Sequence, residues 1–121
     1  MRLAIADDDV ENLDLMRSIL STSSFDIVTA TSGADLVVLL TRGEPLDLIV
    51  TDIDMPWAEG FSVIQAARAS QVDTPVLFVT GVVRPDLAET VLRLGNARLL
   101  HKPVSAAELH RTVKEMLINA S

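Results

Sequence analysis

The sequence predicts an α/β fold in which a parallel sheet is covered by helices on both faces. Five short apolar runs alternate with five longer segments that carry apolar residues at helical spacing. The apolar runs are continuous, which is typical of strands buried on both faces of a parallel sheet. Right-handed crossovers then bring the carboxyl ends of all strands to one edge, where ligands of such folds bind.

The five predicted strands are aliphatic runs bounded by polar residues, glycine or proline. They cover residues 3–6, 27–30, 46–51, 76–79 and 97–100. Each run is too short for a helix of ordinary length, and each is followed by a segment with helical periodicity. The order along the chain is therefore strand, helix, strand, helix, repeated five times.

Start and stop signals define the predicted helices. Asp9 caps the first helix, Ser32 and Asp35 form a capping pair for the second, and Ser105 and Glu108 form one for the last. Residues 55–60 are predicted to be a loop before the third helix, because proline and glycine interrupt them. The apolar positions expected to face the sheet are Val10, Leu13, Met16 and Leu20, residues 36–40, then Phe61, Val63, Ile64 and Ala67, then Leu87, Val91 and Leu94, and finally Leu109, Val113, Met116 and Leu117.

The composition fits one domain with an aliphatic core. Of 121 residues, 49% are hydrophobic and only 3% aromatic, and the absence of cysteine excludes disulfides and thiolate metal sites. A formal net charge of -7 argues against binding of nucleic acid or an anionic membrane by this domain itself. The apolar runs fall far short of the roughly 20 residues that span a bilayer. We expect a single cytoplasmic domain over residues 1–121, either stand-alone or part of a longer protein.

Polar residues directly follow four of the predicted strands, at the edge where the carboxyl ends meet. They are Asp7 and Asp8 after the first strand, Asp52 and Asp54 after the third, Thr80 and Gly81 after the fourth, and Lys102 and Pro103 after the fifth. We therefore expect residues that are far apart in sequence to form one small site. That site would contain several carboxylates, a hydroxyl group and an ammonium group.

These residue types suit metal-assisted chemistry on a phosphoryl group. Clustered carboxylates repel one another, and a hard divalent cation such as Mg²⁺ relieves the repulsion. Lys102 supplies a compact positive charge, while the Thr80 hydroxyl group and the N–H of Gly81 can donate to phosphoryl oxygens. Gly81 also lets the backbone approach closely. Asp52 is central among the strand ends, so we expect it to be the nucleophile that forms an aspartyl phosphate.

Each of these residues has an ordinary structural interpretation when it is taken alone. Residues 7–9 can cap a helix, Thr80 can occupy a turn, and Lys102 can be a surface lysine before a proline. The functional interpretation is favoured because all of them fall at the same edge. His101 at a strand end and His110 on a solvated helix face are not spaced as a metal site.

The same residues resemble the signature of the receiver domain of two-component response regulators over essentially the whole chain. The matching pieces are Asp7-Asp8, Asp52-Ile53-Asp54-Met55-Pro56 with Gly60, Thr80-Gly81 and Lys102-Pro103. The resemblance implies a flavodoxin-like, doubly wound parallel sheet with strand order 2-1-3-4-5. It implies a phosphorylation switch and not a conventional enzyme, with a sensor histidine kinase or phosphotransfer protein as the partner that phosphorylates Asp52.

The resemblance also implies roles for individual residues. Mg²⁺ is expected to bind Asp8, Asp52 and the backbone carbonyl of Asp54, with Asp7 acting largely through water. Thr80, Gly81 and Lys102 are the expected phosphoryl contacts.

Two further positions bear on the conformational switch that the resemblance implies. A cis bond before Pro103 is expected to point Lys102 into the site. The family usually has an aromatic residue three positions before the lysine, where this chain has Leu99. We therefore expect the coupling between Thr80 and the signalling surface to differ from the usual pattern.

Two other functions stay open at this point. A phosphatase of the haloacid dehalogenase type also uses an Asp-x-Asp motif, a strand-end Thr and a Lys, although its Asp-x-Asp follows the first strand. A degenerate receiver that acts only as a protein-interaction module is the second alternative. The sequence names neither the kinase nor the downstream effector, and it leaves homodimerisation open.

Overall fold

The computed structural model describes residues 1–21, 25–53, 60–81 and 85–119. The strands are β1 (Arg2–Ala6), β2 (Asp26–Ala30), β3 (Leu48–Thr51), β4 (Val76–Thr80) and β5 (Ala97–His101). The helices are α1 (Val10–Leu20), α2 (Gly33–Arg42), α3 (Gly60–Ala69), α4 (Leu87–Leu94) and α5 (Ala106–Asn119). Strands and helices alternate along the chain, as predicted.

The five strands form one sheet with the order β2-β1-β3-β4-β5. All neighbouring strands are parallel, so their carboxyl ends lie at one edge of the sheet. This order confirms the doubly wound, flavodoxin-like topology predicted from the sequence. β2 lies on one side of β1, whereas β3, β4 and β5 follow on the other side. The carboxyl ends of β1 and β3 therefore flank the switch point at which such folds bind ligands.

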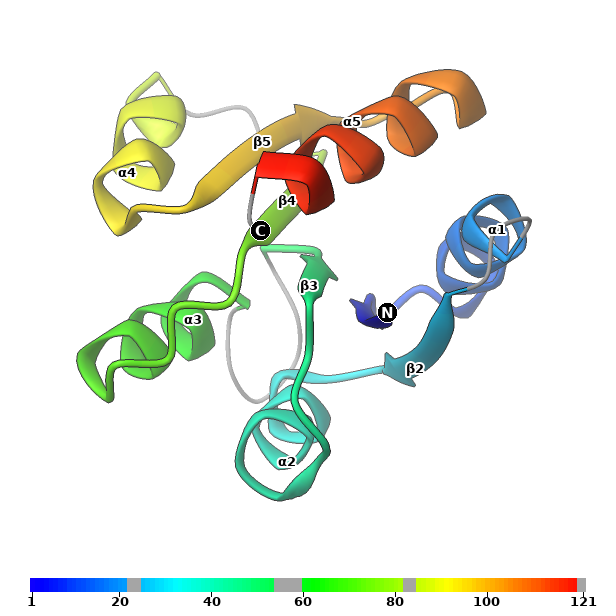
Figure 1. Ribbon diagram of the computed structural model, residues 1–121. Coiled ribbons are helices and arrows are strands. Elements are labelled where there is room, and N and C mark those ends of the chain that lie inside the picture. The colour runs from blue at the N-terminus through cyan, green and yellow to red at the C-terminus, as the bar shows by residue number, and fades with distance from the viewer. Residues whose placement is uncertain (22–24, 54–59, 82–84, 120–121) are drawn as a thin grey trace.

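Helices cover both faces of the sheet (Figure 1), with α1 and α5 on one face and α2, α3 and α4 on the other. Alternate residues of β1 point into the two layers: Leu3 and Ile5 pack with α1 and α5, whereas Ala4 and Ala6 pack with the other helices. Burial of each large aliphatic side chain contributes about 1.5–3 kcal/mol to the stability of such a core. Among the described residues, no helix combines the length and apolarity that a membrane crossing requires.

The predicted helix caps are confirmed. The Asp9 carboxylate accepts from the N–H groups of Glu11 and Asn12, and the Ser32 hydroxyl accepts from the N–H of Asp35. At the start of α5, the Ser105 hydroxyl accepts from the N–H of Glu108 at 3.0 Å. These bonds satisfy donors that the first turn of a helix leaves without intrahelical partners.

The structure corrects several details of the predicted pattern. Val10 does not join the buried face of α1 but is 57% exposed at the first position of the helix. In α2, Leu36 is buried whereas Val37 and Val38 are exposed, as helical geometry requires of successive residues. Gly60, which was expected in a loop, is the first residue of α3.

Candidate functional site

The strand ladders continue one residue past the strand ends and place the polar residues beside one another. The N–H of Asp7 donates to Ala30 O at 3.1 Å, and the N–H of Asp52 donates to Ala6 O at 2.9 Å. On the other side of the site, the N–H of Lys102 donates to Thr80 O at 2.8 Å. Backbone hydrogen bonds therefore hold the candidate residues at fixed positions along the sheet edge.

Three carboxylates meet at this edge. One oxygen from each of Asp7, Asp8 and Asp52 lies within 4.8 Å of the others. Asp7 is fully buried, Asp52 is 9% exposed, and Asp8 is exposed to solvent. Such a set of hard oxygen donors, buried on one side and open on the other, is suited to a hydrated Mg²⁺ ion.

The Lys102 ammonium group joins two of these acids. Its Nζ lies 3.1 Å from Asp7 Oδ2 and 3.5 Å from Asp52 Oδ2. Burial lowers the pKa of Lys102, but the hydrogen bond to Asp7 and the negative charges of Asp52 and Asp7 together outweigh it, so the pKa is raised. Lys102 is therefore a permanent cation at neutral pH, placed beside the carboxylate expected to react.

Asp7 is held at both of its oxygens. Its Oδ2 accepts from Lys102, and its Oδ1 accepts from the N–H of Asp9 at 2.9 Å. A fully buried carboxylate needs such partners, because an unpaired buried charge is costly. Asp8 lies at the exposed side of the cluster, so it is better placed than Asp7 for direct contact with a hydrated ion.

Two residues support the backbone at Asp52: Thr51, for which the sequence predicted no role, and Gly60, which was named only as part of the family signature and of a predicted loop. The Thr51 hydroxyl group, fully buried, donates to Asp52 O at 2.9 Å. The N–H of Gly60 donates to Ile53 O at 2.7 Å, and a Cβ added at Gly60 would lie only 2.1 Å from Asp52 O. The sequence signal for Thr51 was a hydroxyl group within an otherwise apolar strand.

The remaining predicted residues lie around the three acids. Thr80 ends β4 and is fully buried, and Gly81 follows it with no described atom within 4 Å of an added Cβ. The Lys102–Pro103 peptide bond is cis. Leu99 is partly buried in β5 opposite Phe78 of β4.

Several sequence predictions fall outside the described residues or beyond the site. Asp54, whose backbone carbonyl was expected to bind Mg²⁺, lies outside the described residues. His101 is an exposed strand-end residue, as expected. His110 is partly buried in α5, and not fully solvated as predicted.

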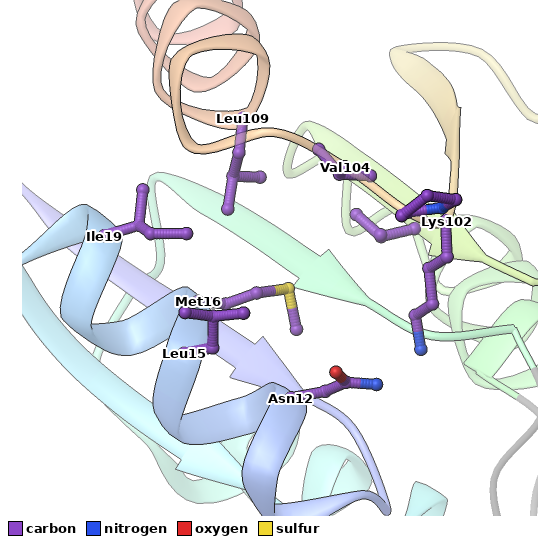
Figure 2. Close-up of a pocket in the computed structure, with 9 residues that line it drawn as sticks. Asn12, Leu15, Met16, Ile19, Lys102, Val104 and Leu109 are labelled. Carbon is purple, nitrogen blue, oxygen red and sulfur yellow. The ribbon is translucent and has the colours of Figure 1, made fainter.

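A groove of about 380 Å³ lies beside the acidic cluster, between α1 and the start of α5. Figure 2 shows its apolar side chains, with the polar ends of Asn12 and Lys102 gathered at one end. The side chains that form the apolar part are Leu15, Met16, Ile19, Val79, Pro103, Val104 and Leu109. The groove therefore connects an apolar surface directly to the lysine of the site.

Residues 3–114 match the family model described as the response regulator receiver domain. The chain belongs to the response regulator receiver family. This assignment covers nearly all of the sequence and decides against the dehalogenase-type phosphatase. Receiver domains are phosphorylation-switch domains of two-component systems and are generally not classed as enzymes. They bind Mg²⁺ at an acidic pocket, which corresponds to the Asp7, Asp8 and Asp52 group of this receiver.

Curated relatives of this receiver domain are transcriptional and response regulators. It is 36% identical over 116 residues to the transcriptional regulatory protein PrrA of Mycobacterium tuberculosis, covering 96% of this chain and 49% of that protein. It is 26% identical to the response regulator SaeR of Staphylococcus aureus, covering 95% of this chain and 50% of SaeR. The chain therefore spans about half the length of the curated relatives it matches.

Solved receiver domains have the same fold. The CheY-like response regulator receiver domain of Methanospirillum hungatei JF-1 aligns with a TM-score of 0.90 at 25% identity, over 98% of this chain and 94% of that one. The receiver domain of the Francisella response regulator 1452 aligns with a TM-score of 0.91 at 24% identity, over 99% of this chain and 98% of that one. At 24% identity, the similarity to the Francisella domain shows the fold alone.

Proposed function

We propose that Asp52 accepts a phosphoryl group from the phosphohistidine of a sensor histidine kinase or a phosphotransfer protein. The observation that supports this most directly is the pairing of the Lys102 ammonium group with Asp52, within a cluster that includes Asp7 and Asp8. Asp52 is the one member that contacts the lysine and still retains partial exposure. It can therefore meet both a cation and an incoming donor.

The transfer exchanges one bond to phosphorus for another. An oxygen of the Asp52 carboxylate attacks phosphorus, the N–P bond of the phosphohistidine breaks, and its electron pair stays with the imidazole, which leaves. Negative charge on the phosphoryl oxygens is met by the Lys102 ammonium group. Hydrolysis of the resulting acyl phosphate by water returns Asp52 to its starting state, so the domain would catalyse its own phosphorylation and dephosphorylation.

The donor set fits Mg²⁺, which prefers oxygen ligands and retains several waters. Asp8, Asp52 and the backbone carbonyl of Asp54 would hold the ion, with Asp7 contributing through water, since Lys102 and Asp9 occupy its oxygens. When bound, Mg²⁺ neutralises charge that builds up on phosphoryl oxygens. Among the described residues, three carboxylates face a single lysine at this edge, so a divalent cation would balance their charge.

Thr80, Gly81 and Lys102 would contact the phosphoryl group. Thr80 is fully buried at the end of β4, and we expect Thr80 and the loop after it to be drawn toward the phosphoryl group, so that the hydroxyl group donates to a phosphoryl oxygen. That movement provides the two-state element on which a switch depends. Leu99, opposite Phe78 on the neighbouring strand, occupies the place of the usual aromatic residue, and we propose that an aliphatic side chain transmits the change here.

The groove between α1 and α5 supports the choice of a protein as phosphodonor. Leu15 is 57% exposed and lies at the groove, next to the reactive edge. A helix that carries a phosphohistidine could cover this apolar side chain while its imidazole approaches Asp52. We propose that the groove is where the phosphodonor docks, because burial of apolar surface supplies affinity close to the transfer site.

Labelling with acetyl phosphate tests the proposed acceptor. Wild type incubated with acetyl phosphate and MgCl₂ should gain one acid-stable, alkali-labile phosphoryl group, measured by intact mass. Asp52→Asn should gain none, because an amide is not a nucleophile of this kind. Asp14→Asn, an exposed aspartate on α1, is the matched control and should label like wild type. Labelling that persists in Asp52→Asn would reject Asp52 as the acceptor, and absence of labelling in wild type would favour the interaction module.

Other properties belong to the same proposal. We propose that residues 1–121 act as one receiver domain located in the cytoplasm, which fractionation of the native protein would check. Sedimentation before and after labelling would show whether the domain forms a homodimer. The domain itself is not expected to bind nucleic acid, given its formal net charge of -7.

A further inference from the structure

At the end of the sheet where the strands begin, opposite the acidic cluster, the side chain of Arg68 joins three segments by hydrogen bonds. Arg68 lies in the last turn of α3, and its side chain is only 12% exposed. Its Nη1 donates to Val72 O at 3.0 Å, in the connection that leads to β4. Its Nε and Nη2 both donate to Gly95 O, at 3.3 and 3.1 Å, and Nη2 also reaches Asn96 O at 3.3 Å.

The turn held by Arg68 is the one that ends α4. Gly95 and Asn96 have φ angles of 77° and 52°, so the chain leaves the helix through two left-handed residues. The Asn96 side chain donates to Asp73 O at 2.9 Å, and Asn96 O accepts the N–H of Val76 at 3.0 Å. The carboxyl end of α4 is therefore fixed both to α3 and to the start of β4.

The guanidinium group suits this role chemically. A planar guanidinium group carries five N–H donors in a fixed fork and can reach carbonyl groups in separate turns, whereas a lysine has three donors on a single nitrogen. Burial lowers the pKa of Arg68, and the charge of Asp73 opposes this only in part, but the guanidinium group remains charged at any physiological pH. Asp73 is largely exposed, and its Oδ1 lies 3.9 Å from Arg68 Nε. The hydrogen bonds to the carbonyl groups therefore hold Arg68 more firmly than this ion pair does.

At the other end of α4, the hydrogen bonds of the described residues stay within the first turn of the helix: the N–H and the hydroxyl group of Thr90 both donate to Asp86 O, at 3.0 and 2.9 Å. Asp86 precedes the helix without making a side-chain cap hydrogen bond. The helix has only eight residues and buries Leu87 and Val91 against the sheet. This end begins at the same sheet edge as Thr80 and Gly81, which are the residues expected to move when Asp52 is phosphorylated.

We propose that Arg68 is a positioning residue that makes α4 pivot about its carboxyl end when the domain is phosphorylated. This inference rests on the proposed function, since phosphorylation supplies the displacement. A helix held at one end and displaced at the other turns about the fixed end. The amino-terminal turn of α4 then moves most, and the turn at Gly95 and Asn96 stays in place. Arg68 thus determines which end of α4 changes position.

Amide hydrogen exchange measured by NMR tests the pivot. In wild type, labelling with acetyl phosphate and MgCl₂ should change exchange at residues 87–90 by at least about fivefold, and at residues 95–97 by less than about twofold. In Arg68→Met, exchange at residues 95–97 should rise at least about tenfold before labelling, and labelling should then change both ends of α4. Arg93→Met removes an arginine that is 76% exposed on α4 itself and should behave like wild type.

The outcomes separate the pivot from the proposed function. Intact mass of each sample reports whether Asp52 is phosphorylated, so a failure of labelling would overturn the proposed function on which the pivot depends. Equal changes at both ends of α4 in labelled wild type would overturn the pivot alone, as would an Arg68→Met variant whose exchange pattern matches wild type. If Arg68→Met does not fold by circular dichroism, Arg68→Lys retains the charge without the fork, and the same pattern of loss at residues 95–97 is expected.

Discussion

Replacing Gly60 by alanine tests the close packing beneath the proposed phosphoacceptor. Gly60 is buried at the start of α3, and an added Cβ would lie 2.1 Å from Asp52 O and 2.8 Å from Thr51 Oγ1. Ordinary contacts between non-bonded carbon atoms begin at about 3.5 Å. The nearer obstacle is backbone and not the end of a flexible side chain, so either α3 or the segment at Asp52 has to move.

The size of the effect follows from this overlap. Overpacking of this kind typically costs about 1–3 kcal/mol, occasionally more. Alanine is a better helix former than glycine by about 1 kcal/mol, which offsets part of the cost at the end of a helix. Because the overlap is with backbone, the upper part of that range, about 2–3 kcal/mol, applies, and after the helix preference we expect a net loss of about 1–2 kcal/mol in the free energy of unfolding. At roughly 3–6 °C per kcal/mol for a domain of this size, Tm should fall by about 3–12 °C.

Two assays follow the change. Thermal unfolding by circular dichroism gives Tm, and acetyl phosphate labelling well below Tm gives the rate at Asp52. Displacement of the Asp52 backbone relative to Lys102 should slow labelling at least about tenfold, which corresponds to about 1.4 kcal/mol in the barrier.

Gly81→Ala is the matched control, because an added Cβ there meets no described atom within 4 Å. Its Tm should be unchanged or slightly higher, since alanine restricts the unfolded chain. A Gly60→Ala variant with the Tm and labelling rate of wild type would refute the packing argument.

Three further perturbations probe the groove, the acids and the lysine. Leu15→Asp should slow phosphotransfer from a kinase that labels wild type by at least about tenfold, while labelling by acetyl phosphate stays unchanged. Leu92→Asp, at a position on α4 that is 71% exposed, is the control and should change neither the kinase reaction nor the acetyl phosphate reaction. MgCl₂ at ten times its Kd should stabilise wild type by about 1.4 kcal/mol. Asp8→Asn should lose that increment and show no Mg²⁺ response of Trp57 fluorescence; an equal response in both proteins would exclude Asp8 as a ligand. Because the pKa of Lys102 is raised on folding, its ion pairs stabilise the fold fully below the ordinary lysine pKa of about 10.4 and less as pH rises through the folded value. The difference in urea midpoint between wild type and Lys102→Met should therefore be constant near neutral pH and shrink above about pH 10.4.

The order of elements was predictable because its signals are local. The caps at Asp9, Ser32 and Ser105 needed only a few neighbouring residues to be recognised. The meeting of the acids with Lys102 was predictable for a different reason. Parallel topology brings every strand end to one edge, so the position of a residue relative to its strand was sufficient.

Features that depend on contacts between distant segments were not predictable in this way. Gly60 was assigned to a loop because glycine usually interrupts helices, and only its contact with the Asp52 carbonyl explains a glycine at the start of α3. Val10 matched the helical period but is exposed at the first position of α1. The carbonyl partners of Arg68 at Val72 and Gly95 come from turns whose shapes no local signal specifies.

The ion pair between Lys102 and Asp7 joins residues 95 positions apart, which follow β5 and β1, two strands that are not neighbours in the sheet. A nascent chain that has emerged only as far as β4 contains all three acids but lacks their lysine. The cation that pairs with Asp7 and Asp52 therefore arrives with the last strand, so this cluster is completed late in the synthesis of the domain.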